Sequence, residues 1–202
     1  MLTEKVDMGY FTDRSIRKLA IPTIKPGVTT ITVKLPFGAR TDSENCFIIG
    51  NFGVAVLGRA RRIVALPEKL AFDDITRQGL AHYGSVVTYH LECETPEDGE
   101  LCIRIPHYRA AVLKITLDGG ERATIAYPPY ETSLGFAKAG KHKIDVAAYI
   151  SRNNSFGTLH HADRFLPYNA PATWFSGGAE WTYEYRLREE GIISTPEIFV
   201  KK

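Results

Sequence analysis

The sequence predicts an all-β protein built as an antiparallel β-sandwich. Apolar and polar residues alternate with a period of two along several segments, and turns rich in Gly, Pro and Asp separate these segments. No strand–helix–strand alternation is visible. Period-two alternation gives a strand one buried and one solvated face, which is typical of antiparallel sheets. The pattern therefore excludes Rossmann and TIM-barrel folds, whose parallel strands alternate with helices.

The predicted strands share this alternation. In chain order they are Thr30–Leu35, Val86–Glu94, Leu101–Ile105, Ala111–Leu117, Ala123–Tyr127, Ile144–Ile150 and Trp181–Arg188. The run Asp118-Gly119-Gly120 lies between two of them and is a turn signal, so a β-hairpin is predicted there. Helical periodicity is nearly absent, and the best candidate for a short helical turn is Pro67–Gly79.

The segment before residue 60 is more ambiguous. Residues Phe47–Val56 are predicted to form two strands broken at Gly53, and the arginine-rich stretch after Gly58 is interpreted as a linker. We therefore expect a β segment over residues 1–58 and the main sandwich over residues 59–202. The first segment either completes the larger sandwich or is the end of a preceding one, because about three strands are few for an independent core.

Composition is that of an ordinary globular protein. The chain has 202 residues, 44% hydrophobic and 24% charged, with a formal net charge of +2. Its densest basic cluster, Arg59, Arg61 and Arg62, is interpreted as a solvated turn, because nucleic-acid binding needs a wider basic face. No nucleic-acid partner is expected. Cys93 and Cys102 could form a disulfide on neighbouring strands, but buried free thiols are the favoured interpretation.

Membrane and export signals are missing from the sequence pattern. Met1–Tyr10 contains no apolar signal-peptide core, and no apolar run approaches the ~18 residues of a membrane-spanning helix. We expect no membrane partner. The compartment stays open between a bacterial cytoplasm and export together with a parent protein.

No familiar catalytic motif is present, so a non-catalytic chain is expected. Glycoside hydrolysis needs two carboxylates facing each other across ~5–10 Å, and no spacing of the acidic residues singles out a pair. The adjacent His160 and His161 resemble metal ligands, but neighbouring strand residues point to opposite faces. No cofactor is predicted. A structural calcium ion held by Asp73, Asp74 and Asp163 is kept as an alternative.

The loop predicted over Ser151–Phe165 is the best candidate for a ligand site. Amide and guanidinium groups can bind vicinal sugar hydroxyls through paired donors and acceptors. The candidate ligands in this loop are Arg152, Asn153, Asn154 and His160. The alternative interpretation is that these side chains satisfy backbone groups of a long loop.

Aromatic side chains on other loops could cover the apolar face of a sugar ring. Trp174 lies in a loop that ends at Gly177-Gly178, Tyr130 closes a Tyr-Pro-Pro-Tyr loop, and Tyr83 follows His82. These three complete the predicted sugar site. Trp181 falls in the apolar register of its predicted strand and is assigned to the core.

Several motifs resemble the C-terminal β-rich region of large bacterial glycoside hydrolases, the family-2-type sugar-binding proteins with galactose-binding-like jelly rolls. The motifs are Gly9–Ile16, Ile48–Val54, Gln78–Gly84 with Val87–Tyr89, Arg152–His160 and Gly191–Pro196. The resemblance implies a jelly roll over residues 59–202 and a catalytic barrel in a separate, upstream region. His82-Tyr83-Gly84-Ser85 stands where the family pattern has Phe-Tyr-Gly-Gly, and a Trp expected shortly before it is either replaced by Phe72 or lost.

These observations leave three functional hypotheses. The first is a non-catalytic carbohydrate-binding or ancillary module of a glycoside hydrolase. The second is a structural module whose residues 1–58 dock against the parent catalytic domain or a second copy, giving a homodimer. Exposure or burial of Trp174 and Tyr130 would separate these two. The third is a complete hydrolase that acts through an unassigned carboxylate pair.

Overall fold

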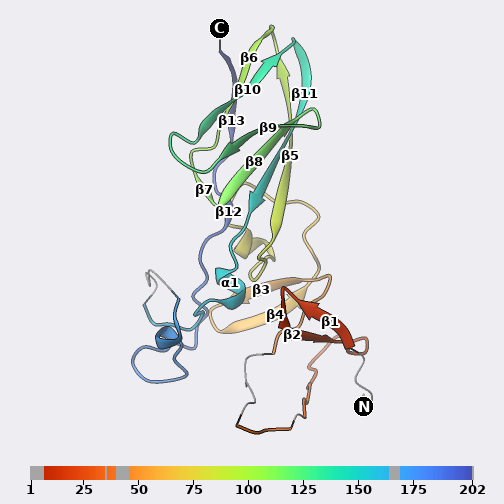
Figure 1. Cartoon of the computed structure of the whole chain (residues 1–202), viewed down its shortest axis with the longest axis vertical. Coiled ribbons are helices and arrows are strands. Elements are labelled where there is room, and N and C mark those ends of the chain that lie inside the picture. The colour runs from red at the N-terminus through yellow and green to blue at the C-terminus, as the bar shows by residue number, and fades with distance from the viewer. Residues whose placement is uncertain (1–6, 35, 40–45, 164–168, 202) are drawn as a thin grey trace. The chain divides into compact units, whose positions relative to one another are not determined.

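The computed structural model describes residues 7–34, 36–39, 46–163 and 169–201 (Figure 1). The chain divides into two compact units, Met1–Ile48 and Ile49–Lys202. The boundary predicted near residue 60 lies inside the second unit.

The first unit contains one β-hairpin. Strand β1 (Asp7–Phe11) pairs antiparallel with β2 (Asp13–Leu19). The turn between them is supported by the Asp13 carboxylate, which accepts hydrogen bonds from the backbone N–H (2.8 Å) and the hydroxyl (2.6 Å) of Ser15. The expected short N-terminal β segment is therefore present.

The strand predicted at Thr30–Leu35 is wrong for Thr30–Lys34, which form no strand, while Leu35 lies outside the described residues. Ile31 and Val33, its predicted core residues, are exposed. Alternation produces a strand only where a neighbouring strand accepts its backbone hydrogen bonds, and none is present here among the described residues.

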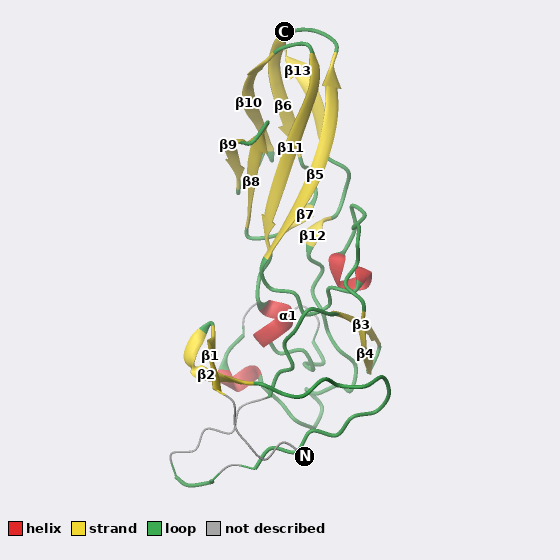
Figure 2. Ribbon diagram, turned by 90° about the vertical axis from the view of Figure 1, so that its right-hand side faces the viewer, coloured by secondary structure: helices red, strands yellow, loops and turns green. Residues whose placement is uncertain are grey.

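The second unit is dominated by an antiparallel β-sandwich, which confirms the predicted fold class (Figures 1 and 2). One sheet has the order β5-β11-β8-β9, and the other has the order β10-β6-β13. The strands are β5 (Val86–Thr95), β6 (Gly99–Arg104), β8 (Val112–Leu117), β9 (Gly120–Ile125), β10 (Glu131–Ala137), β11 (Gly140–Tyr149) and β13 (Glu197–Lys201).

The core lies between these sheets and is made by the inward members of each alternating run. Ile115 on β8 and Val146 on β11 are fully buried, as are Leu101 and Ile103 on β6 of the opposite sheet. Their partners along each strand are more polar and more exposed. Burying each such side chain contributes about 1.5–3 kcal/mol, so the alternation itself specifies the sandwich.

The hairpin predicted at Asp118–Gly120 is confirmed. Leu117 pairs with Gly120, and the two loop residues Asp118 and Gly119 both have positive φ, 51° and 81°. Two positive φ values are what a two-residue type I′ turn requires, and Asp-Gly adopts them readily.

Two strands of the sandwich were not predicted. In β10 the pairing register shifts between Ser133 and Gly135, so the alternation of apolar residues is interrupted. In β13 three consecutive residues, Ile198, Phe199 and Val200, are partly buried, which hides the period of two. A bulge and an edge strand therefore remove the signal that identified the other strands.

Short elements connect the sandwich to the rest of the second unit. The pair β7 (Tyr108–Arg109) and β12 (Gly191–Ile192) is antiparallel, and a 3₁₀ turn, η1, covers Ile75–Gln78 within the predicted helical segment. Strands β3 (Gly53–Leu57) and β4 (Ala60–Val64) form a hairpin. The interpretation of the arginine stretch as a linker is corrected, because Arg61 and Arg62 belong to β4.

The strand predicted at Trp181–Arg188 is also corrected. Only Trp181 makes a bridge, with His161, and the following backbone N–H groups bond to different neighbours. Those of Thr182 and Arg186 donate to carbonyls of residues 159–160, whereas that of Tyr185 donates to Gly58 of the β3–β4 turn. These hydrogen bonds do not follow the alternating spacing of an antiparallel ladder, so the segment forms no regular strand.

The predicted loop over residues 151–165 contains one helical turn, α1 (Asn153–Phe156), and a 3₁₀ turn, η2, follows at Pro171–Thr173. Cys46, Cys93 and Cys102 are free thiols, and burial raises the pKa of Cys93 and Cys102. No helix in the described residues is long and apolar enough to span a membrane.

Candidate functional site

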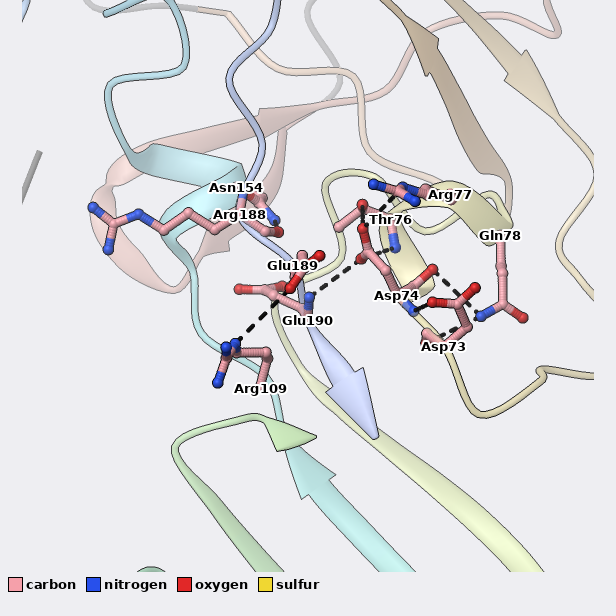
Figure 3. Close-up of polar contacts among 10 residues, drawn as sticks. All are labelled: Asp73, Asp74, Thr76, Arg77, Gln78, Arg109, Asn154, Arg188, Glu189 and Glu190. Carbon is pink, nitrogen blue, oxygen red and sulfur yellow. Dashed lines mark hydrogen bonds and ion pairs between the residues drawn. The ribbon is translucent and has the colours of Figure 1, made fainter. Parts of the chain in front are cut away.

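Asn154, at the centre of the predicted sugar site, is fully buried. Its side-chain amide donates to the backbone carbonyl of Arg188 (2.7 Å) and accepts from the Arg188 N–H (2.9 Å). Figure 3 draws both residues at the side of the segment that leads into β12. The amide thus acts as a two-point clamp between α1 and the segment that leads into β12. These contacts are those of the alternative interpretation, in which loop side chains satisfy backbone groups.

The loop of Tyr83 lies against α1. His82 forms a hydrogen bond through Nδ1 to the carbonyl of Asn154 (2.6 Å), and the Ser155 hydroxyl donates to the His82 carbonyl (2.8 Å). Arg152 Nε donates to the Gly84 carbonyl (3.4 Å). Tyr83 uses its hydroxyl to donate to the Val86 carbonyl (2.9 Å). The loop that carries Tyr83 is therefore held against α1 by its two neighbours, His82 and Gly84.

Asn153 and Trp174 occupy more accessible positions. The side-chain oxygen of Asn153 accepts a hydrogen bond from Nδ2 of Asn169 (2.8 Å), and Asn153 is half-buried. Trp174 follows η2 with 48% of its surface exposed, and its neighbour Phe175 packs edge-on against His161. Trp174 is thus accessible to a ligand.

Tyr130 belongs to a different part of the second unit. Its ring packs edge-on against Tyr108 with centroids 5.4 Å apart, and its carbonyl accepts a hydrogen bond from Ile105 within the sandwich. It is half-buried beside the core. The predicted site residues therefore fall in two places: Tyr130 in the sandwich, and the others in the loops around α1 and the segments after it.

His160 leads to a cluster of rings that the sequence did not identify as a site. Its ring lies 4.5 Å from that of Tyr185 and 5.8 Å from that of Trp181, measured between centroids. Trp181 in turn contacts Tyr183 edge-on at 4.3 Å, and Tyr183 is 67% exposed. The Trp181 side chain is only partly buried, so its assignment to the core is corrected.

Two arginines of the β3–β4 hairpin complete this surface. The guanidinium carbon of Arg59 lies 5.6 Å from the Tyr183 ring centroid, and that of Arg61 lies 5.4 Å from the Tyr185 centroid. Both distances are within the range of cation–π attraction. We call the surface made by Arg59, Arg61, His160, Trp181, Tyr183 and Tyr185 the aromatic–arginine face.

Sequence patterns pointed to these residues but assigned them another role. In Trp181-Thr182-Tyr183-Glu184-Tyr185 the rings alternate, which predicts a buried strand face. The feature that could have indicated an exposed face was the residue type, because Tyr and Trp carry polar groups and occur on solvated binding surfaces as well as in cores. The contact with an arginine hairpin more than a hundred positions earlier depends on tertiary structure.

A second polar cluster lies where η1 meets β12 (Figure 3). Asp74, which is 4% exposed, accepts hydrogen bonds from Thr76 N (3.0 Å), Thr76 Oγ1 (2.7 Å) and Glu190 N (3.2 Å). Arg77 Nε lies 3.6 Å from the same carboxylate. Asp74 thus joins the 3₁₀ turn to the segment before β12.

Glu190 is also 4% exposed, and it is less well satisfied. One carboxylate oxygen accepts from the Ser151 hydroxyl (2.5 Å), while the other has no hydrogen-bond partner among the described residues. Burial raises the pKa of Glu190 to about 7, and the negative charge of Asp74 acts in the same direction. Glu190 therefore titrates near neutral pH.

Neither a metal centre nor an open acid pair emerges from this cluster. The described residues contain no group of three or more His, Cys, Asp or Glu side chains suited to a metal ion, and both Asp74 oxygens already accept hydrogen bonds. Calcium binding there has no support in this geometry. Asp74 and Glu190 are too deeply buried to face a glycosidic bond. The cluster is best understood as a structural junction.

The fold and this surface define an all-β sandwich domain with an exposed ring-and-arginine surface. No protein-family model matches the chain, and no curated protein matches it. Among solved structures, it is similar to a rhamnosidase from Novosphingobium sp. PP1Y, with 14% identity and a TM-score of 0.46 over 73% of this chain and 14% of that chain.

A second similar structure is a GH2 beta-galacturonidase from Eisenbergiella tayi bound to glycerol. Its identity is 19% and its TM-score is 0.35, over 59% of this chain and 21% of that chain. The chain therefore spans less than a quarter of the length of either enzyme that it matches.

Proposed function

We propose that this chain is a non-catalytic carbohydrate-binding or ancillary module of a glycoside hydrolase. The observation that carries the proposal is the aromatic–arginine face, where the exposed ring of Tyr183 and the partly buried ring of Tyr185 lie beside guanidinium groups. An aromatic ring covers the apolar C–H face of a sugar, and guanidinium N–H groups donate to its hydroxyls. The resemblance of the sequence motifs to glycoside hydrolase C-terminal regions supports the same proposal.

The proposed binding surface centres on Tyr183 and Trp181 rather than on Asn154. The amide nitrogen and oxygen of Asn154 both bond to the Arg188 backbone, so this side chain stabilises the loop and is not available to a ligand. His160 belongs to the face itself, and Trp174 is an exposed ring on a nearby stretch of chain. Each ring or exposed hydrogen bond contributes about 1 kcal/mol, so millimolar dissociation constants are expected for short sugars.

A structural module is the second candidate, because the first unit exposes many large apolar side chains. Ile31 and Val33 are exposed, as are Met8, Phe37 and Ile48. Apolar surface of this kind commonly marks a protein–protein contact. In this alternative, residues 1–48 dock against the parent catalytic domain or a second copy, and the chain binds no sugar.

A binding screen with matched variants tests the first candidate. Glycan arrays followed by isothermal titration calorimetry are done on the wild type, on Tyr183→Ala and on Trp174→Ala. Phe136→Ala is the control, because Phe136 is 71% exposed on β10 of the sandwich and lies outside the aromatic–arginine face. Loss of a ring should weaken binding about fivefold to tenfold.

Saturable binding that Tyr183→Ala weakens and Phe136→Ala preserves would support the module and its location. Weakening by Trp174→Ala but not by Tyr183→Ala would instead move the site to the loop after η2, where Trp174 lies. If no glycan binds to protein that is folded by circular dichroism, the carbohydrate proposal is rejected and the structural module is the better account.

A further inference from the structure

We propose that the aromatic–arginine face recognises acidic saccharides, meaning chains whose sugar units carry carboxylate or sulfate groups. This inference rests on the proposed carbohydrate-binding function and specifies the ligand class. It rests on three properties of Arg59 and Arg61: their positions over the rings of Tyr183 and Tyr185, the restricted freedom of their side chains, and their positive charge.

The geometry pairs two arginines with two rings. Arg61 lies in β4, and Arg59 lies two positions earlier in the hairpin turn. Tyr183 and Tyr185 are also two positions apart, and each ring lies beneath one guanidinium at 5.6 and 5.4 Å. The backbone hydrogen bond from Tyr185 N to Gly58 O (3.0 Å) fixes this alignment.

Cation–π contact with the rings restricts the arginine side chains before any ligand arrives. A guanidinium held over a ring loses less side-chain freedom on binding, and its planar edge still presents N–H donors. That edge matches the two oxygens of a carboxylate or the oxygens of a sulfate, with which it forms paired charge-assisted hydrogen bonds.

The charge of the hairpin is not neutralised within the described part of the chain. No carboxylate there forms an ion pair with Arg59, Arg61 or Arg62, all of which are exposed. The acidic groups nearest to Tyr183 along the sequence have other partners. Glu184 pairs with Arg186 (3.3 Å), and Glu180 lies 3.6 Å from His161. An anionic ligand would supply the missing charge.

The aromatic component favours a saccharide over a bare anion. Tyr183 is 67% exposed and contacts Trp181 edge-on, so it offers an apolar surface next to the cations. A sugar unit with an acidic group can place its C–H face on the ring while its anion meets the guanidinium. An inorganic anion would use only the second of these interactions.

Calorimetric titration with length-matched oligosaccharides tests the inference. The ligands are oligogalacturonides for carboxylate, sulfated galactan oligosaccharides for sulfate, neutral galactan oligosaccharides and duplex DNA. The variants are Arg59→Gln/Arg61→Gln and, as a control, Arg62→Gln. Arg62 is an exposed arginine of the same strand, but alternation directs it to the opposite side.

We expect at least one acidic ligand to bind about tenfold more tightly than its neutral counterpart, as charge-assisted hydrogen bonds imply. The double variant should lose that preference and keep the neutral affinity, whereas Arg62→Gln should keep the preference. Comparing the affinities of the oligogalacturonides and of the sulfated oligosaccharides identifies which anion the face binds. Raising the salt concentration should weaken the acidic ligands selectively.

Equal affinity for acidic and neutral oligosaccharides would overturn this inference while leaving the carbohydrate-binding proposal intact. A preference that Arg62→Gln reduces as much as the double variant would also overturn it, because the effect would then come from overall charge. If duplex DNA binds as tightly as the acidic sugars, the inference is also overturned, because any polyanion would then be bound through overall charge. Failure of every saccharide to bind would reject both proposals.

Discussion

Replacing Glu190 with Gln should make the protein more stable at alkaline pH. Glu190 is buried with one carboxylate oxygen unpartnered, and burial together with Asp74 raises its pKa from 4.5 to about 7. The folded state therefore holds this proton more tightly than the unfolded state does. Stability from the protonated group is fully present below pH 4.5 and is lost as pH rises through about 7.

The magnitude follows from the pKa. At ~1.4 kcal/mol per factor of ten in the proton affinity, ionising Glu190 in the folded protein costs about 3 kcal/mol. Screening by water near the exposed Ser151 reduces this to about 2 kcal/mol. Glu190→Gln keeps the shape and removes the charge, so its free energy of unfolding should exceed that of the wild type by about 2 kcal/mol at pH 8.

Urea denaturation followed by tryptophan fluorescence at pH 4.5, 6 and 8 measures this difference. Glu189→Gln is the matched control, because Glu189 is half exposed and lies 4.0 Å from Arg109, a pairing expected to contribute little. The wild type and the control should lose stability between pH 4.5 and 8, whereas Glu190→Gln should lose less. A Glu190→Gln protein that is less stable than the wild type at pH 8 would refute the reasoning.

Three further substitutions test other parts of the second unit. Asn154→Ala removes both hydrogen bonds from a fully buried side chain to the Arg188 backbone and should lower the free energy of unfolding by about 2–3 kcal/mol, measured by urea denaturation. Gly191→Ala should lower the free energy of unfolding by about as much or more, because φ is 104° and the added Cβ would come within 2.7 Å of the buried Ile75 side chain. An unchanged urea midpoint would contradict this. Hydrogen bonding to Asp118 raises the pKa of His142, so Asp118→Asn should lower that pKa and reduce stability more at pH 5.5 than at pH 8, as NMR titration and urea unfolding would show.

The sandwich was predictable because local pattern and tertiary burial agree along most of its strands. In the strands at Val86–Thr95 and Val112–Leu117, every second residue is apolar, and the same residues fill the core. The Asp118-Gly119 turn was equally local, since two positive φ values restrict the residue types that fit. Where a bulge interrupts the period, as at Gly135, the sequence carries no such signal.

The candidate site was less predictable, because alternation reports amphipathicity and says nothing about what covers the apolar side. The rings of Trp181, Tyr183 and Tyr185 alternate as a core strand would, yet the Tyr183 ring faces solvent beneath Arg59. Asn154 shows the converse. Its polar side chain predicts a ligand contact, but the fold buries it against the backbone of Arg188.

The sequence by itself determined the all-β class, most sandwich strands and the turn at Asp118–Gly119, because each depends on residues that are close together along the chain. Only the tertiary structure decided which polar groups are buried, such as Glu190, and which aromatic rings meet the arginines of the β3–β4 hairpin. The hydrogen bond from Glu190 to Asp74 and the contacts of Arg59 and Arg61 with the rings join segments more than a hundred residues apart, and no period or spacing encodes such a distance.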